Sequence, residues 1–194
     1  SQLAKKHNAL IIIDEVQSGI GRTGTFFAYE QFNITPDILC FAKGIANGFP
    51  LGGILTSDKI GNFMSIGSHG TTFGGGPIAC SIGSLVVDII SKKTFLKKVQ
   101  KKEGVFLNQL NKINSKHKCF KKILSAGLWI SVEFDHSMSL CVDSLIRNAH
   151  KSGLMILKAN ANTIRFSPSL IIEDNLIAEG LAIFEEVILQ TLQE

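Results

Sequence analysis

The chain has 194 residues, a formal net charge of +4 at pH 7 and 45% hydrophobic residues, so it can hold one large domain or two small ones around a folded core. Its four cysteines show no Cys-x-x-Cys spacing and lie in apolar runs, which argues against a disulfide framework or zinc site and favours free, buried thiols in a reducing compartment. No apolar run approaches the roughly 20 residues that cross a bilayer, so we expect a soluble, cytoplasmic protein.

Three short apolar strands are predicted in the first half, at residues 11–14, 38–42 and 53–56, followed by a helix over residues 77–91. Residues 1–8 have the pattern of a helix end that leads into the first strand, with no methionine or signal peptide, as in a chain entered midway. Strands connected in this way indicate an α/β layer whose strand ends present functional groups.

The stretch from Lys92 to Lys122 contains eleven lysines and no arginine. Apolar residues recur through it at near-helical spacing, at Phe95, Val99, Phe106, Leu107, Leu110 and Ile113. This pattern predicts an amphipathic helix whose lysines face water. A nucleic-acid surface is the alternative, but such surfaces usually add arginine forks or stacking aromatics, so we expect no nucleic-acid partner.

The second half is predicted to form a smaller α+β domain. A helix follows the lysine-rich stretch, and strands are expected at residues 127–134, 154–157 and 163–166, with helices near residues 140–151 and over residues 174–192. A boundary near residues 91–94 divides the chain into domains 1–92 and 93–194.

Lys43 follows the strand at residues 38–42 and opens a glycine-containing turn. A lysine at the mouth of a buried strand loses hydration, which leaves an amine able to attack a carbonyl. Asp14 ends the strand at residues 11–14. A pyridoxal phosphate enzyme needs such a pair, because the lysine bonds the cofactor aldehyde while the carboxylate keeps the pyridine nitrogen protonated. Taken alone, Lys43 is better explained as a surface lysine that follows a strand, and Asp14 at the second strand end is what favours the reactive role.

A glycine cluster at residues 67–77 includes the hydroxyls of Thr71 and Thr72, and Pro77 suits the first turn of the following helix. Hydroxyls and free backbone N–H groups bind phosphate. Turn hydroxyls that satisfy nearby backbone groups are the alternative.

Four segments, at residues 14–24, 36–44, 68–75 and 164–168, resemble in order and spacing the class III (ω-amino acid) aminotransferases. The resemblance implies pyridoxal phosphate fold type I, with the second part of the large, mostly parallel-sheet domain and a C-terminal α+β small domain. It implies a cytoplasmic homodimer with shared active sites that moves an amino group from an ω-amino donor such as N-acetylornithine to 2-oxoglutarate. Only the C-terminal half of the family is resembled, so the main phosphate-cradling loop is expected in the other half.

The resemblance also implies roles for single residues. Lys43 would hold pyridoxal phosphate and transfer protons, and Asp14 would contact the pyridine nitrogen. Gln17 would hydrogen-bond the phenolic oxygen of the cofactor, an exposed turn glutamine being the alternative. Thr72, with Thr71 beside it, would reach the phosphate site of the neighbouring subunit. Arg165 would clamp a substrate carboxylate through its planar fork, and a structural salt bridge is the alternative.

Three departures from the family pattern leave the donor less certain than the reaction. Gly76 stands where relatives have asparagine, Asn47 where glycine is usual, and residues 124–127 lack an arginine. The open alternatives are another class III enzyme (ornithine, succinyldiaminopimelate or 4-aminobutyrate aminotransferase, or an aminomutase), an inactive fragment, or one piece of a split enzyme. Glu15, beside Asp14, is expected to be structural, and no metal site is expected.

Overall fold

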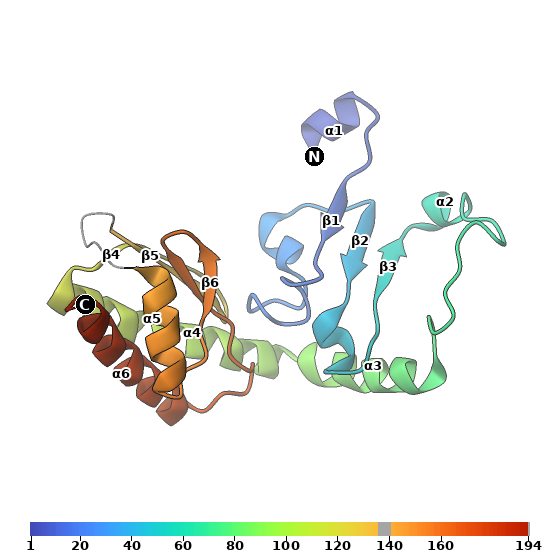
Figure 1. Ribbon diagram of the computed structural model, residues 1–194. Coiled ribbons are helices and arrows are strands. Elements are labelled where there is room, and N and C mark those ends of the chain that lie inside the picture. The colour runs from blue at the N-terminus through green and yellow to red at the C-terminus, as the bar shows by residue number, and fades with distance from the viewer. Residues whose placement is uncertain (136–140, 194) are drawn as a thin grey trace. The chain divides into compact units, whose positions relative to one another are not determined.

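The computed structural model describes residues 1–135 and 141–193 and divides the chain into two compact units, Ser1–Lys97 and Lys98–Glu194 (Figure 1). The division falls inside helix α4 (Lys93–His117), which therefore contributes residues to both units. Each unit has a sheet of its own.

The N-terminal unit contains a three-stranded sheet in the order β1-β2-β3. β1 and β2 run parallel, whereas β3 is antiparallel to β2, so the part of the sheet seen in this chain is mixed. The elements of this unit are α1 (Gln2–Lys6), β1 (Ile12–Asp14), η1 (Ala28–Phe32), β2 (Ile38–Phe41), η2 (Lys43–Ala46), β3 (Gly53–Thr56), α2 (Asp58–Gly61) and α3 (Pro77–Ile90), where η marks a 3-10 helix.

Asp37 ties the start of β2 to both neighbouring strands. Its Oδ2 accepts a hydrogen bond from the Ile11 N–H at 2.7 Å, and its own N–H donates to the Ile11 carbonyl at 2.8 Å. The Asp37 carbonyl accepts a hydrogen bond from the Thr56 hydroxyl at 2.9 Å. One residue therefore connects three strands at the edge opposite to the one where β1 and β2 end.

The core of the N-terminal unit connects the loop after β1 with β2, η2 and α3. It consists of six buried apolar residues, Ile20, Phe27, Leu39, Ile45, Ala46 and Val86. Helix α3 begins at Pro77, whose fixed φ angle suits the first helical turn. At Gly83 an added Cβ would lie only 2.8 Å from Leu51 Cδ2, so the helix packs closely on the segment around η2.

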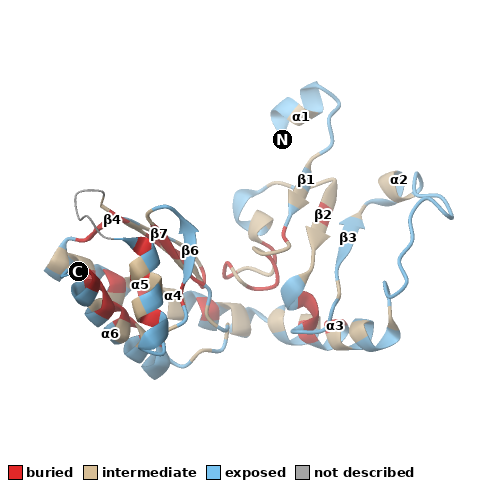
Figure 2. Cartoon of the chain, viewed as in Figure 1, coloured by how far each residue is buried: buried red, intermediate tan, exposed pale blue. Residues whose placement is uncertain are grey.

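The C-terminal unit contains a four-stranded antiparallel sheet in the order β4-β5-β7-β6. Along β5, Ile130, Val132 and Phe134 are buried and alternate with half-buried residues, so one face of the sheet packs on the core (Figure 2). The elements after α4 are β4 (Phe120–Ala126), β5 (Trp129–Phe134), α5 (Val142–Lys151), β6 (Leu157–Asn160), β7 (Thr163–Phe166) and α6 (Asp174–Thr191).

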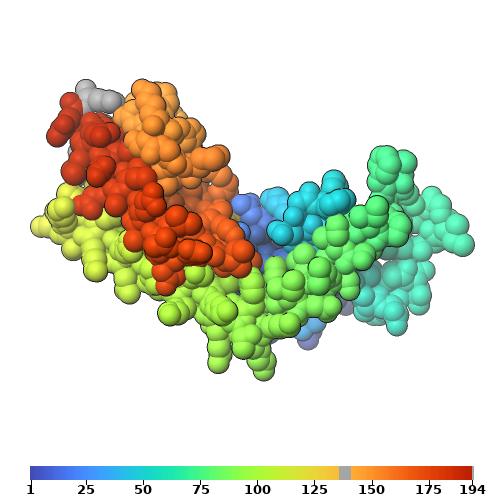
Figure 3. All heavy atoms as spheres, turned by 90° about the horizontal axis from the view of Figure 1, so that it is seen from below, coloured from blue at the N-terminus to red at the C-terminus, as the bar shows by residue number. Residues whose placement is uncertain are grey.

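Helix α6 closes this core and lies against α4 (Figure 3). The Phe184 ring of α6 lies 5.0 Å from the ring of Phe166 and 6.2 Å from that of Phe120, measured between centroids. The lysine-rich helix is confirmed as amphipathic, because Val99 and Leu110 on α4 are fully buried while most of its lysines are exposed. Its lysines thus serve as the solvated face of a core helix.

Two predicted elements of the second half are wrong. The sequence predicts a helix ahead of residue 127, but Phe120–Ala126 form β4, an edge strand with solvent-facing lysines that weaken its strand pattern. The strand expected at residues 154–157 lies instead at Leu157–Asn160. The apolar residues that suggested it include Ile156, which is buried in the connection from α5 to β6.

The expectation of four buried thiols is also wrong. Cys119 is buried, and burial raises the pKa of its thiol to about 11. Cys40 is half-buried, whereas Cys80 and Cys141 are exposed, and all four are free. Apolar neighbours in the sequence did not predict burial because successive residues of a helix such as α3 point to different sides.

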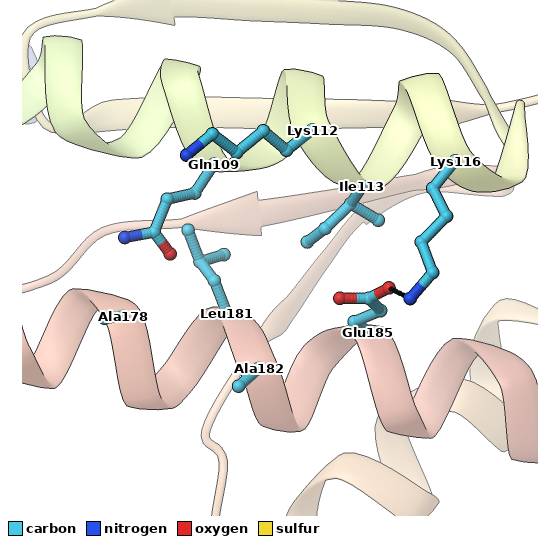
Figure 4. A pocket seen from close by; sticks show the side chains of 8 residues that line it. All are labelled: Gln109, Lys112, Ile113, Lys116, Ala178, Leu181, Ala182 and Glu185. Atoms are coloured by element: carbon cyan, nitrogen blue, oxygen red, sulfur yellow. Dashed lines mark hydrogen bonds and ion pairs between the residues drawn. The ribbon is translucent and has the colours of Figure 1, made fainter.

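Glu185 links α6 to the C-terminal end of α4 (Figure 4). Its Oε1 accepts a hydrogen bond from Lys116 Nζ at 2.8 Å and lies 2.6 Å from His117 Nε2. The hydrogen bond from Lys116, followed by that from His117, lowers the pKa of Glu185 from its ordinary value of 4.5. The carboxylate form is therefore favoured in the folded state.

We predict that Glu185→Gln lowers the stability of the chain at neutral pH but not in acid. A lowered carboxyl pKa adds stability that is present above the unfolded value of 4.5 and is lost as the pH falls through the folded value. Thermal unfolding followed by circular dichroism should give a free energy of unfolding that is lower than that of the native chain by about 1 kcal/mol or less at neutral pH. This difference should disappear in acid. Glu186→Gln, on the exposed neighbouring position, is the matched control. A difference that is the same in acid and at neutral pH would contradict the assignment.

Candidate active site

Asp14 and Lys43 lie at the same edge of the N-terminal sheet. Asp14 is the last residue of β1 and pairs with Cys40 of β2, and the Glu15 N–H donates to the Cys40 carbonyl at 2.8 Å. β2 ends at Phe41, and Lys43 begins η2 directly afterwards. Because the two strands are parallel, their carboxyl ends share one edge, which is where ligands bind in open α/β sheets.

The Asp14 carboxylate is exposed and held by its own backbone. Its Oδ1 accepts a hydrogen bond from the Val16 N–H at 2.8 Å, which fixes the side chain against the turn after β1. This bond uses one oxygen of a carboxylate that has about four acceptor sites. Asp14 therefore keeps acceptor capacity for a cationic N–H donor.

Lys43 is exposed, contrary to the expectation that its amine loses hydration. In the described part of the chain, the buried positions of η2 are taken by Ile45 and Ala46 instead. The Lys43 backbone has a φ angle of 49°, in the left-handed region, where a non-glycine residue costs on the order of 1–3 kcal/mol. Such strain is typical of functional positions and persists only where the surrounding packing enforces it.

Asn47 explains one departure from the family pattern. It ends η2 with a φ angle of 45°, so this position requires a left-handed backbone. Asparagine is one of the few non-glycine residues that adopt this conformation at modest cost. The turn therefore keeps its shape with asparagine in place of glycine.

Glu15 organises the loop that contains Gln17. Its side chain is only 1% exposed, with Oε1 accepting from the Tyr29 N–H at 2.7 Å and Oε2 accepting from the Ser18 hydroxyl at 2.5 Å. The Gly19 N–H donates to the Glu15 carbonyl at 3.0 Å. These bonds confirm a structural role for Glu15, and they hold the half-buried Gln17 three residues after Asp14.

Thr71 and Thr72 lie in an exposed turn ahead of α3. An added Cβ on Gly74 would lie 2.0 Å from Thr71 Cγ2, so a larger residue there would require the Thr71 side chain to move. Within residues 1–135 and 141–193, neither threonine hydroxyl bonds to another group, so the bonds to nearby backbone expected of ordinary turn hydroxyls are not seen. In the same turn, the Ser68 hydroxyl lies 3.0 Å from His69 Nδ1.

Arg165 lies on β7, in the C-terminal unit, between Ser131 of β5 and Leu157 of β6. Its Nε is buried without a hydrogen-bond partner. Among the described residues Arg165 forms no ion pair, so the structural salt bridge considered as its alternative role is not seen. Its place in a site with Asp14 and Lys43 remains a prediction.

The part of the chain that the structure describes contains no group of three His, Cys, Asp or Glu side chains placed to hold a metal ion. None of its described helices combines the length and apolarity of a membrane span.

Residues 1–188 match the family model described as "Aminotransferase class-III". The chain belongs to the class III aminotransferases. It is 43% identical over 187 residues to the acetylornithine aminotransferase of Vibrio cholerae, covering 96% of this chain and 46% of that relative. It is 41% identical over 189 residues to the acetylornithine/succinyldiaminopimelate aminotransferase of Photorhabdus laumondii, covering 97% and 47%.

Solved structures agree with this family assignment. The N-acetylornithine aminotransferase of Stenotrophomonas maltophilia has a TM-score of 0.89 at 28% identity and covers 99% of this chain and 50% of that one. The ornithine aminotransferase of Plasmodium yoelii has a TM-score of 0.88 at 27% identity, covering 98% and 50%. The predicted family and fold class are confirmed, and the chain spans about half the length of these relatives.

We predict that Glu15→Gln destabilises the loop between β1 and η1. An amide supplies only one acceptor oxygen where the carboxylate uses two, so one buried donor loses its partner, at a cost of about 1–3 kcal/mol. Urea unfolding should show this loss, and hydrogen exchange at the Tyr29 amide should accelerate. Glu30→Gln is the matched control, because Glu30 is exposed and, among the described residues, accepts a hydrogen bond from the Phe27 N–H alone. Equal effects of the two substitutions would contradict the role of Glu15.

Proposed function

We propose that this chain supplies the lysine, the acid and the substrate arginine of a pyridoxal-phosphate-dependent aminotransferase. The enzyme moves an amino group from an ω-amino donor such as N-acetylornithine to 2-oxoglutarate. The observation that carries the proposal is the shared sheet edge of Asp14 and Lys43. Pyridoxal phosphate fits this pair, because an exposed amine can bond its aldehyde and an exposed carboxylate can hold a proton on its ring nitrogen.

Each residue at this edge has a proposed task. Lys43 would hold the cofactor and, as a free amine, would take a proton from the reacting carbon of the amino donor in the first half-reaction and give one to the keto carbon of 2-oxoglutarate in the second. Asp14 holds the ring nitrogen in its protonated form, and Gln17 donates to the phenolic oxygen. The bound cofactor supplies an electron sink for the charge left on that carbon.

The remaining groups belong to binding. Thr71 and Thr72, whose hydroxyls have no partner among the described residues, bind the cofactor phosphate of a neighbouring subunit, so the proposed enzyme is a homodimer with shared sites. Its proposed compartment is the cytoplasm. Arg165 binds a substrate carboxylate through two parallel N–H bonds. Because the chain covers about half the length of its relatives, the proposed site also requires groups from the half that it does not cover.

N-Acetylornithine is the favoured donor because the relatives that match nearly the whole chain at 41–43% identity include enzymes named for acetylornithine. Ornithine is the second candidate, supported by the structural similarity to ornithine aminotransferases at 27% identity. The two donors differ at the α-amino group, so parallel assays with both decide between them.

We predict that Lys43→Ala abolishes covalent attachment of pyridoxal phosphate at this edge. Incubation of the chain with the cofactor, reduction with borohydride and peptide mapping should label Lys43 in the native chain, because Lys43 directly follows β2 at the same sheet edge as Asp14. Lys59→Ala, which removes an exposed lysine of α2, should leave this labelling unchanged. Labelling that falls mainly on Lys59 or another lysine would contradict the assignment.

We predict that Asp14→Asn permits cofactor binding but lowers turnover of the active enzyme by about two orders of magnitude or more, each tenfold step being about 1.4 kcal/mol of barrier. An amide cannot hold the ring nitrogen in its protonated form, so the electron sink weakens. Steady-state rates with 2-oxoglutarate measure the effect, and Asp58→Asn, at the exposed start of α2, is the control. Rates near those of the native enzyme would exclude Asp14 as the partner of the ring.

A further inference from the structure

The loop after β1 contains a backbone conformation that is unusual for its residue. Ile20 has a φ angle of 54°, and Gly21, which follows it, has a φ angle of 79°. A left-handed backbone is rare and costly for a β-branched residue, because its Cβ comes too close to the following carbonyl oxygen. Glycine adopts the same conformation without this cost. The isoleucine side chain at this position therefore has to provide contacts that offset the strain.

The Ile20 side chain is buried against the turn that begins with Lys43. It is 4% exposed and belongs to the same core as Ile45 and Ala46 of η2. Its Cβ, Cγ2 and Cγ1 lie 3.5, 3.6 and 4.0 Å from the position that a Cβ on Gly44 would take. Apolar atoms at such distances are in contact, so the β-branch of Ile20 fills the space beside Gly44.

Backbone contacts hold Ile20 in place from both sides. The Gly19 N–H donates to the Glu15 carbonyl at 3.0 Å, and the Gly21 N–H donates to the Phe26 carbonyl at 3.1 Å. An added Cβ on Gly19 would lie 2.8 Å from the Glu15 carbonyl oxygen, so the two segments pack closely. The strained residue is thus fixed by the loop in which it lies.

The Lys43 amine has no such support from a partner of its own. It is exposed, and none of the described residues bonds to it. Its direction relative to the Asp14 carboxylate therefore depends on the backbone at Lys43, with its φ angle of 49°, and on the packing of Gly44 directly after it.

We propose that Ile20 is a positioning residue for Lys43, which acts through Gly44 by filling the space beside the turn. Without this β-branch, the turn relaxes into the space and directs the amine away from Asp14. The inference rests on the proposed function, in which the cofactor contacts both Lys43 and Asp14. It explains why a position whose backbone suits glycine carries an isoleucine.

Competitive labelling of the full chain measures the direction of the amine. The chain is treated with pyridoxal phosphate and borohydride, and the label on Lys43 is divided by the label on Lys59, an exposed lysine of α2. Ile20→Ala should lower this ratio by about threefold or more, since a misplacement of about 1 Å can slow a reaction by as much as about 100-fold. Acetic anhydride, which needs only an accessible amine, should label the two lysines in the same ratio in both chains.

Two further variants should keep or recover the native ratio. Ile20→Val keeps the Cβ and both Cγ atoms that lie beside Gly44. Gly44→Ala, added to Ile20→Ala, places a methyl group 3.5 Å from the Cβ that remains at position 20, and the φ angle of Gly44 lies outside the left-handed region that would forbid it. Ile90→Ala is the matched control, because Ile90 packs on the same core at the end of α3, and it should leave the ratio unchanged.

Circular dichroism verifies that each variant is folded. Ile20→Leu, which keeps the side-chain volume but moves the branch from Cβ to Cγ, should lower the ratio as well and takes the place of Ile20→Ala if that variant does not fold. An unchanged ratio in the folded variant, or an equal fall in Ile90→Ala, would overturn the role of Ile20 alone. A native chain without preferential labelling of Lys43 would overturn the proposed function and this inference with it.

Discussion

The parallel pairing of β1 with β2 is the constraint on which the proposed site depends. Asp37 connects the strands at one end, and the Glu15 N–H bond to Cys40 closes the ladder at the other. Side chains alternate along a strand, so a slip of one residue would turn every side chain of β1 to the opposite face. Glu15 would then lose its buried bonds to Tyr29 and Ser18, and Asp14 would take its place in the core. The buried Glu15 therefore holds the exposed Asp14 in position.

The turn after β2 shows how packing sustains a strained backbone at Lys43. Lys43 and Asn47 both have left-handed backbones, and the residues between them include Ile45 and Ala46, which are buried in the core of the N-terminal unit. Helix α3 packs on this segment through Gly83. The cost of the positive φ angle at Lys43 is offset by burial of its neighbours, so the backbone of the turn keeps one conformation.

Sequence reasoning located the strands β1, β2 and β3 and helix α3 to within a residue or so, because each is an apolar run bounded by turn signals. It failed for β4, whose solvent-facing lysines hide the alternation of an edge strand. The predicted loss of hydration at Lys43 was also wrong, because the residues of η2 that reach the core are Ile45 and Ala46. The bond from Tyr29 to Glu15 spans 14 residues and follows no motif, so only the folded chain reveals it.

Charged residues in the described part of the chain differ in whether the fold gives them a partner. Glu185 is engaged by Lys116 and His117, and Glu15 by two buried donors. Arg165 differs, because its buried Nε lacks the partner that almost all buried polar groups find. Leaving such a donor unpaired costs about 1–3 kcal/mol in the folded chain. A bound carboxylate would recover that cost, which supports the proposal that Arg165 binds a substrate carboxylate.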